Sequence, residues 1–199
     1  MIIIGLTGSI GMGKSTTSEM FKSLGVPVMS ADEIVHQLYS ADAAPLIEAA
    51  FPGTAPDGVV NRQALSEKLM AAPEDFKRLE AIIHPLVRAR EQGFVDEAAA
   101  RNEPMVLLDI PLLFETATTD RVDVIVVVSC APEIQRQRVM ARPGMTAEKF
   151  EAILSRQTPD AEKRARADYV IDTGQGLETA QRQVADIVAE LTKSTMRDQ

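Results

Sequence analysis

A short glycine-rich segment near the amino terminus constrains the fold of this chain more than any other feature. Residues 8–15 read Gly-Ser-Ile-Gly-Met-Gly-Lys-Ser and fit the pattern G-x-x-x-x-G-K-[ST]. Residues 2–6 before it begin with three β-branched isoleucines and are typical of a buried strand. Residues 14–24 after it carry apolar side chains at helical spacing, and Gly25 is a typical helix end. The pattern therefore lies in the strand, turn and helix context that it requires.

The residue types of this loop indicate which ligand it binds. Gly8, Gly11 and Gly13 allow a close backbone approach and positive φ angles, so that several N–H groups can converge on phosphate oxygens. Lys14 can neutralise β- and γ-phosphates, and the Ser15 hydroxyl can bind Mg²⁺. We therefore expect a nucleoside triphosphate with Mg²⁺. Bare glycine-rich turns without a ligand also exist, and they are the alternative.

Asp109 is the natural second acidic group for this metal. It ends the apolar run of residues 105–109, and a carboxylate at the end of a strand can lie beside a phosphate loop. The alternative is a strand-end aspartate that caps a turn at Pro111. Both interpretations stay open from the residues alone.

Several apolar runs predict an α/β fold with a parallel sheet covered by helices on both faces. Residues 105–108, which Asp109 follows, and residues 124–128 are continuously apolar, and 27–29 and 169–171 form shorter strands. Helices are expected over 32–39, from Pro132, over about 146–156 and over 177–191. Residues 40–102 contain no long strand run and predict a helical insertion, in which Pro85 should kink or break a helix after His84, with a second helix from Leu86 to about Arg101.

The composition excludes several classes of protein. The 199 residues carry 21 Lys and Arg against 29 Asp and Glu, a net charge of −8, which disfavours a large nucleic-acid surface. The longest apolar runs are far shorter than the roughly 20 residues of a membrane span. Cys130 is the single cysteine, is read as structural, and cannot form an intramolecular disulfide. We expect a cytoplasmic protein that binds neither nucleic acid nor membrane; the oligomeric state stays open.

A phosphate loop alone does not separate a small-molecule kinase from a switch GTPase or a mechanical ATPase. The chain lacks Asn-Lys-x-Asp, the guanine-reading signature. It has instead a helical insertion and a later arginine-rich helical segment, which suit a kinase with an acceptor lobe and a lid that excludes water. Arg138 and Arg142, four residues apart, could clamp a polyphosphate from one helix face, or form a solvated charge stripe.

Asp32 follows the second strand, at the sheet edge where open α/β proteins bind ligands. A carboxylate there can accept the proton of an attacking hydroxyl. Its alternative role is the N-cap of the next helix.

These features together resemble the dephospho-CoA kinase family. The resemblance rests on residues 4–15, Ala31-Asp32, Leu79 with His84-Pro85, Pro111-Leu112-Leu113-Phe114-Glu115, Gln135-x-x-Arg138-x-x-x-Arg142 and Ala167-Asp168-Tyr169-Val170-Ile171-Asp172. It implies an ATP-dependent phosphorylation of the ribose 3′-hydroxyl of dephospho-CoA. Another kinase acting on a nucleotide or small metabolite is the alternative, as is a regulatory NTPase. The chain departs from the usual family pattern at Ser30, His36 and Thr173.

The resemblance also implies a division of the chain and a set of site residues. Residues 1–39, 103–135 and 166–199 would form the nucleotide-binding core, 40–102 the acceptor lobe and 136–165 the lid. The catalytic residues would be Asp32, Lys14 and Arg138, with Ser15 and Asp109 at the metal. The ATP-binding residues would be Gly11, Met12, Gly13, Lys14, Ser15, Thr16, Arg138, Arg142 and Thr173, and the acceptor-binding residues Asp32, His36, His84, Arg88 and Leu113.

Overall fold

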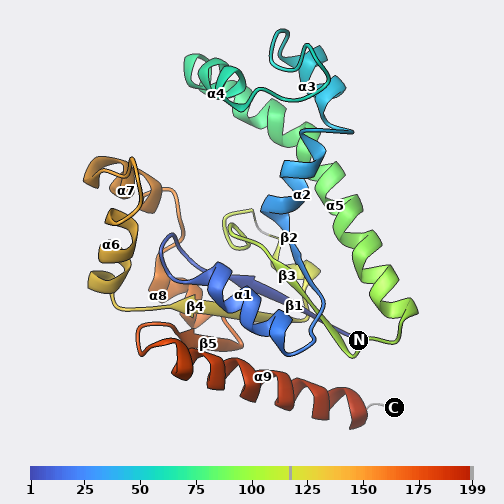
Figure 1. Ribbon diagram of the computed structural model, residues 1–199, viewed down its shortest axis with the longest axis vertical. Coiled ribbons are helices and arrows are strands. Elements are labelled where there is room, and N and C mark those ends of the chain that lie inside the picture. The colour runs from blue at the N-terminus through green and yellow to red at the C-terminus, as the bar shows by residue number, and fades with distance from the viewer. Residues whose placement is uncertain (117, 198–199) are drawn as a thin grey trace. The chain divides into compact units, whose positions relative to one another are not determined.

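A five-stranded parallel sheet forms the centre of the fold. The computed structural model describes residues 1–116 and 118–197. The strands are β1 (Ile2–Thr7), β2 (Val28–Ser30), β3 (Met105–Asp109), β4 (Val124–Ser129) and β5 (Tyr169–Asp172). Their order across the sheet is β2-β3-β1-β4-β5, with β1 parallel to both β3 and β4 and β5 parallel to β4 (Figure 1). The predicted parallel α/β fold is confirmed.

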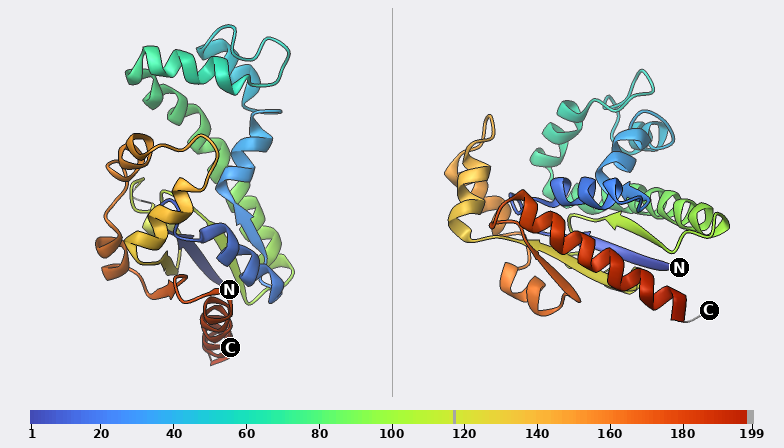
Figure 2. Two further views of the ribbon diagram at one scale, coloured as in Figure 1. Left: turned by 60° about the vertical axis from the view of Figure 1, so that its left-hand side comes forward. Right: turned by 60° about the horizontal axis from the view of Figure 1, so that its bottom comes forward.

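Helices flank this sheet. They are α1 (Lys14–Ser23), α6 (Pro132–Met140), α7 (Ala147–Leu154), α8 (Asp160–Ala165) and α9 (Leu177–Arg197), with a 3-10 turn η2 (Thr119–Arg121). Helices α1 and α9 lie side by side (Figure 2), and α8 contacts β4. Phe21 of α1 and Val184 of α9 are buried with the strand residues Ile4, Leu107 and Val128 in one apolar core. This packing covers one face of β3, β1 and β4. The alternate residues Val106, Leu108 and Val127 are buried as well, which explains why β3 and β4 have continuous apolar sequences.

The chain divides into two compact units, residues 1–28 with 97–199, and residues 29–96. The second unit contains α2 (Ala31–Leu38), α3 (Ala44–Ala50), α4 (Arg62–Ala71), the 3-10 turn η1 (Pro73–Asp75) and most of α5 (Phe76–Ala100). It has its own apolar core, which includes Leu38, Ile47, Leu65 and Ile83. The helical nature of residues 40–102 is confirmed, whereas the finer division into core, acceptor lobe and lid stays a prediction.

Four local expectations were wrong. Helix α5 continues through Pro85, so no second helix begins at Leu86; the ring removes only one backbone donor, and the flanking turns keep their helical hydrogen bonds. Helix α8 was missed, and α9 extends to Arg197 rather than ending at residue 191. Helix α6 ends at Met140, so Arg142 lies in the turn after it and not on the helix.

Candidate active site

The phosphate loop has the geometry that its glycines predict. Gly11 and Gly13 have φ angles of 79° and 94°, in the left-handed region that favours glycine. Gly8 passes so close to β4 that a Cβ atom there would lie 2.4 Å from Val128 Cγ2 and 2.9 Å from the Val128 carbonyl oxygen. Helix α1 starts directly after the loop, so its free N–H groups and partial positive charge lie at this site.

Lys14 and Asp109 form an ion pair beside this loop. Lys14 is the first residue of α1 and Asp109 the last residue of β3, so the carboxyl edge of the sheet brings them together. The Lys14 side chain is 15% exposed and that of Asp109 5% exposed. An ammonium and a carboxylate in so sheltered a place interact more strongly than they would in water.

The predicted magnesium ligands are chemically suited to that ion. Ser15 offers an exposed hydroxyl in the first turn of α1, and Asp109 offers a carboxylate. Among the described residues, no group of three or more His, Cys, Asp and Glu side chains could hold a metal by itself. Mg²⁺ is commonly held by one or two protein oxygens together with substrate phosphates and water, so this donor set fits a metal that arrives with a nucleotide.

A cavity of about 290 Å³ adjoins the phosphate loop. It brings together most of the predicted ATP-binding residues, namely Gly11, Gly13, Thr16, Arg138, Arg142 and Thr173. Met20, Leu177 and Ala180 add an apolar wall from α1 and α9. Although Arg142 lies beyond α6, it shares this cavity with Arg138.

Arg138 is held beside the loop by residue 173. Its guanidinium donates to the Thr173 hydroxyl at 3.0 Å and to the Thr173 carbonyl at 2.7 Å. The Thr173 hydroxyl in turn donates to the Met12 carbonyl at 2.7 Å. The Thr173 side chain is therefore engaged with the loop itself, and its contact with ATP stays a prediction. Nearby Cys130 is buried, and burial raises the pKa of its thiol, whereas the positive charge of Arg138 lowers it.

The second unit contains a larger and more open cavity of about 610 Å³. One part is polar, with Asp32 and Arg62, and the remainder is mainly apolar, lined by Val35, Tyr39, Leu65, Leu69, Phe76 and Leu79. Asp32 is exposed in the first turn of α2, whereas Ser30 accepts the capping hydrogen bond from the Glu33 N–H. The alternative role of Asp32 as N-cap is thus wrong, because Ser30 already fills it.

Arg62 is a candidate site residue that sequence reasoning missed. Its guanidinium donates to His36 Nδ1 at 2.8 Å and lies 5.3 Å from the centre of the Tyr39 ring. Burial raises the pKa of the Tyr39 hydroxyl, and the charge of Arg62 partly offsets this. The sequence contains a signal for the start of α4, because Asn61 is a typical N-cap and Arg62 follows it in the first turn. No local feature of the sequence indicates that this turn lies near α2.

The other predicted acceptor residues are dispersed. His36 reaches the cavity of the second unit only through Arg62, and His84 and Arg88 are exposed on α5 without lining it. Leu113 is completely buried, and its side chain is one of the neighbours that a Cβ atom on Gly5 would meet, at 3.2 Å, with the Val122 side chain nearer at 3.0 Å. Its side chain therefore lies among the buried apolar residues of the first unit, and the acceptor contact of Leu113 stays a prediction.

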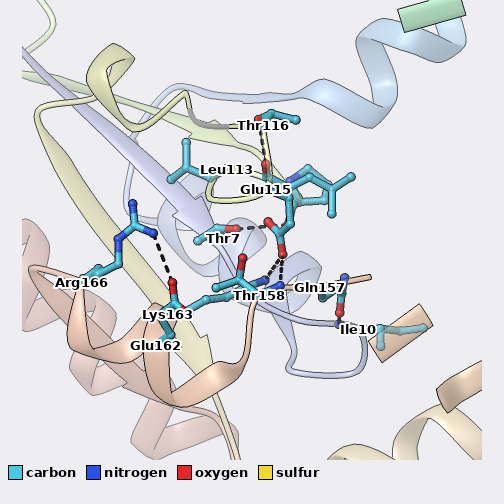
Figure 3. A network of polar contacts seen from close by, with 12 residues as sticks. Thr7, Ile10, Leu113, Glu115, Thr116, Gln157, Thr158, Glu162, Lys163 and Arg166 are labelled. Carbon is cyan, nitrogen blue, oxygen red and sulfur yellow. Dashed lines mark hydrogen bonds and ion pairs between the residues drawn. The ribbon is translucent and has the colours of Figure 1, made fainter. Parts of the chain in front are cut away.

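Lys163 and Glu115 form a buried ion pair close to the phosphate loop (Figure 3). Lys163 is fully buried, and its Nζ lies 2.8 Å from Glu115 Oε1. The same oxygen accepts the Thr158 N–H at 2.8 Å. Burial alone would raise the pKa of Glu115, but the Lys163 ammonium and the hydrogen bond from Thr158 outweigh it and lower that pKa. The Gln157 side chain, next to Thr158, contacts the loop at Ile10.

Comparisons with known proteins agree with this architecture. The family model for dephospho-CoA kinase matches residues 2–179. A dephospho-CoA kinase of Agrobacterium fabrum is 60% identical over 191 residues, which cover 96% of this chain and 98% of the relative. A crystal structure from Thermus thermophilus superposes with a TM-score of 0.81 at 36% identity, covering 96% of this chain and 97% of the other.

A solved dephospho-CoA kinase from Campylobacter jejuni superposes with a TM-score of 0.74 at 27% identity, covering 96% of this chain and 98% of the other. The similarity thus includes the helical unit as well as the phosphate loop. With the family model matching most of its length, this chain belongs to the dephospho-CoA kinase family.

Proposed function

We propose that the chain transfers the γ-phosphoryl group of ATP to the ribose 3′-hydroxyl of dephospho-CoA, giving coenzyme A and ADP. The observation that carries the phosphoryl-transfer part is the Lys14–Asp109 pair at a glycine loop that opens α1. The acceptor follows from the family to which the chain belongs. This is the final step of coenzyme A synthesis.

The residues around the first cavity have roles in holding ATP. Backbone N–H groups of residues 11–16 surround the phosphates, and Lys14 neutralises their charge. Arg138 and Arg142, which line the same cavity, approach the transferring group. Ser15 and Asp109 would hold Mg²⁺, which would neutralise charge on the phosphate oxygens.

Asp32 is proposed as the general base. Its carboxylate accepts the proton of the 3′-hydroxyl as that oxygen forms a bond to the γ-phosphorus. The bond between the γ-phosphorus and its bridging oxygen breaks at the same time, and ADP leaves with the electron pair. Asp32 is exposed and lines the cavity of the second unit. A general base must be accessible in this way, because the hydroxyl of the incoming acceptor has to reach it.

That cavity suits the chemistry of the acceptor. Dephospho-CoA joins a charged pyrophosphate to a long, partly apolar pantetheine arm. The cavity combines the Arg62 cation with a wall of Leu65, Leu69, Phe76 and Leu79. We assign the pyrophosphate to Arg62 and the arm to the apolar wall, because guanidinium groups bind phosphates and apolar walls bury alkyl chains.

The acceptor test separates this function from its rivals. With Mg-ATP, dephospho-CoA should stimulate ADP formation far more than AMP, shikimate or gluconate. Mass spectrometry should find one added phosphate, at the 3′ position. A better rate with AMP or another acceptor would contradict the proposed substrate while leaving a kinase. Hydrolysis that no acceptor stimulates would favour a regulatory NTPase.

The cellular setting is proposed from the same reasoning. None of the helices in residues 1–116 and 118–197 is long and apolar enough to cross a membrane. The substrates are water-soluble, and we assign the chain to the cytoplasm. Fractionation of cells that produce the full chain tests this assignment.

A further inference from the structure

The backbone of Ile10, in the middle of the phosphate loop, is held on both sides by glutamine side chains. Gln135 Nε2 donates to the Ile10 carbonyl at 2.8 Å, and the Ile10 N–H donates to Gln157 Oε1 at 3.1 Å. Gln135 is buried, with 6% of its surface exposed. Neither glutamine has a role in the reaction described above.

The two glutamines enclose the arginine-bearing segment. Gln135 lies on α6, and Gln157 lies between α7 and α8. The residues between them include Arg138 and Arg142, which line the cavity next to the loop. Both ends of this segment are therefore attached to the same residue of the phosphate loop.

Gln157 is itself fixed in position by the buried ion pair. The N–H of its neighbour Thr158 donates to Glu115, and Glu115 pairs with the fully buried Lys163 of α8 (Figure 3). A buried charge pair tolerates little displacement, because separating the two charges leaves each one desolvated and uncompensated. The acceptor oxygen for the Ile10 N–H is thereby held in a defined place.

Such support has a physical purpose in this loop. Gly8, Gly11 and Gly13 make the loop compatible with phosphate, but glycine also gives the free chain many alternative conformations. Any ordering left until the nucleotide binds weakens the affinity for it. Two hydrogen bonds, one on each of the two peptide units that meet at Ile10, remove part of this freedom in advance.

We propose that Gln135 and Gln157 are positioning residues for ATP: they fix the Ile10 backbone and so preorganise the N–H groups that receive the phosphates. The proposal rests on the assignment of this loop to ATP. The two side chains act with opposite polarity, since Gln135 donates and Gln157 accepts.

This polarity allows a matched experiment. An ionised glutamate is only an acceptor. Gln157→Glu therefore keeps the bond to the Ile10 N–H, whereas Gln135→Glu loses the bond to the carbonyl, although both substitutions add the same charge. Gln137→Ala is the control, because Gln137 is exposed on the same helix α6.

The measurements are the dissociation constant of Mg-ADP by titration calorimetry, the melting temperature, and hydrogen exchange of the Ile10 amide. Gln157→Ala should weaken Mg-ADP binding by about 3- to 10-fold, the equivalent of one net hydrogen bond, and should accelerate Ile10 exchange. Gln157→Glu should retain slow Ile10 exchange, and Gln135→Glu should bind Mg-ADP more weakly than Gln157→Glu.

Distinct results contradict the inference and the proposed function. If the glutamine variants bind Mg-ADP as the Gln137→Ala control does, the two residues do not position the loop, even where the melting temperature falls. Equal affinities of the two glutamate variants would also overturn the proposal. If the unsubstituted protein fails to bind Mg-ADP, the ATP assignment itself is wrong.

Discussion

Arg138 donates one hydrogen bond to the hydroxyl and one to the carbonyl of Thr173, so its guanidinium is anchored to the loop that follows β5. Thr173 is bonded in turn to Met12 of the phosphate loop. The arginine is thus positioned by the protein itself, at the wall of the cavity assigned to ATP. Preorganised cations of this kind stabilise charge that develops in a transition state.

Arg138→Ala should therefore lower kcat by roughly 10²- to 10³-fold while the KM for ATP rises much less. Steady-state kinetics with both substrates measures this split. Arg136→Ala is the matched control, since Arg136 lies on the same helix but is exposed and paired with Glu151 at 2.9 Å. An unchanged kcat in the Arg138 variant would leave Arg138 as a structural link between α6 and Thr173.

Lys14→Ala should reduce turnover by at least about 10²-fold, because the loop loses its ammonium group. The same substitution removes the cation beside the sheltered Asp109 carboxylate, so the melting temperature should fall as well. Asp109→Asn tests the metal assignment separately. It should raise the Mg²⁺ concentration for half-maximal rate by roughly 10-fold, whereas an unchanged Mg²⁺ requirement would remove Asp109 from the metal site.

Asp32→Asn should lower kcat by roughly 10²- to 10⁴-fold, the range for a lost general base. Mg-ATP binding should be preserved, because the phosphate loop belongs to the other unit. Glu33→Gln, which changes the neighbouring exposed carboxylate, should have little effect. A variant of Asp32 with a normal rate would remove it from the proposed chemistry.

Arg62→Ala should raise the KM for dephospho-CoA by roughly 10-fold without changing the KM for ATP, because a charge-assisted contact with phosphate is lost. Arg78→Ala provides the comparison. Arg78 also lies 5.3 Å from the centre of an aromatic ring, that of Phe51, but does not line the cavity. Equal effects of the two substitutions would argue against a pyrophosphate site at Arg62.

The Glu115–Lys163 pair predicts a pH dependence of stability. The pKa of Glu115 is held below its ordinary value, so the ionised carboxylate stabilises the fold above the unfolded-state pKa of about 4.3, and this contribution is lost as pH falls through the lower folded-state pKa. Urea unfolding of the wild type and Glu115→Gln should therefore give free energies that differ most near neutral pH and converge in acid. A gap that widens on acidification would contradict the assignment.

The sequence predicts the nucleotide-binding unit well, because its signals are local. The apolar run of residues 105–109 becomes β3 with the same bounds, and Gly13 adopts the positive φ that its motif implies. Asp109 and Lys14 meet because parallel strands and their helices bring such positions to one edge of the sheet. Helix α8 had signals of its own, with Pro159 before it and Asp160 and Glu162 in its first turn.

Interactions between distant residues were beyond sequence reasoning. Glu115 and Lys163 lie 48 positions apart, Gln157 and Ile10 lie 147 apart, and no periodicity relates them. Arg62 joins His36 only because two helices of the same unit pack together. At Pro85, by contrast, a local rule predicted a kink or break and a second helix from Leu86, whereas α5 is one continuous helix.

The complete burial of the Lys163 amine makes this lysine a chemical reporter of local opening. Amine-reactive reagents modify exposed lysines such as Lys77 directly, but they can reach Lys163 only after α8 has separated from Glu115. The labelling rate of this one amine, followed by peptide mass spectrometry, thus measures how often the segment opens in the folded protein. A ligand that tightens the segment would slow the labelling of Lys163 and leave that of Lys77 unchanged.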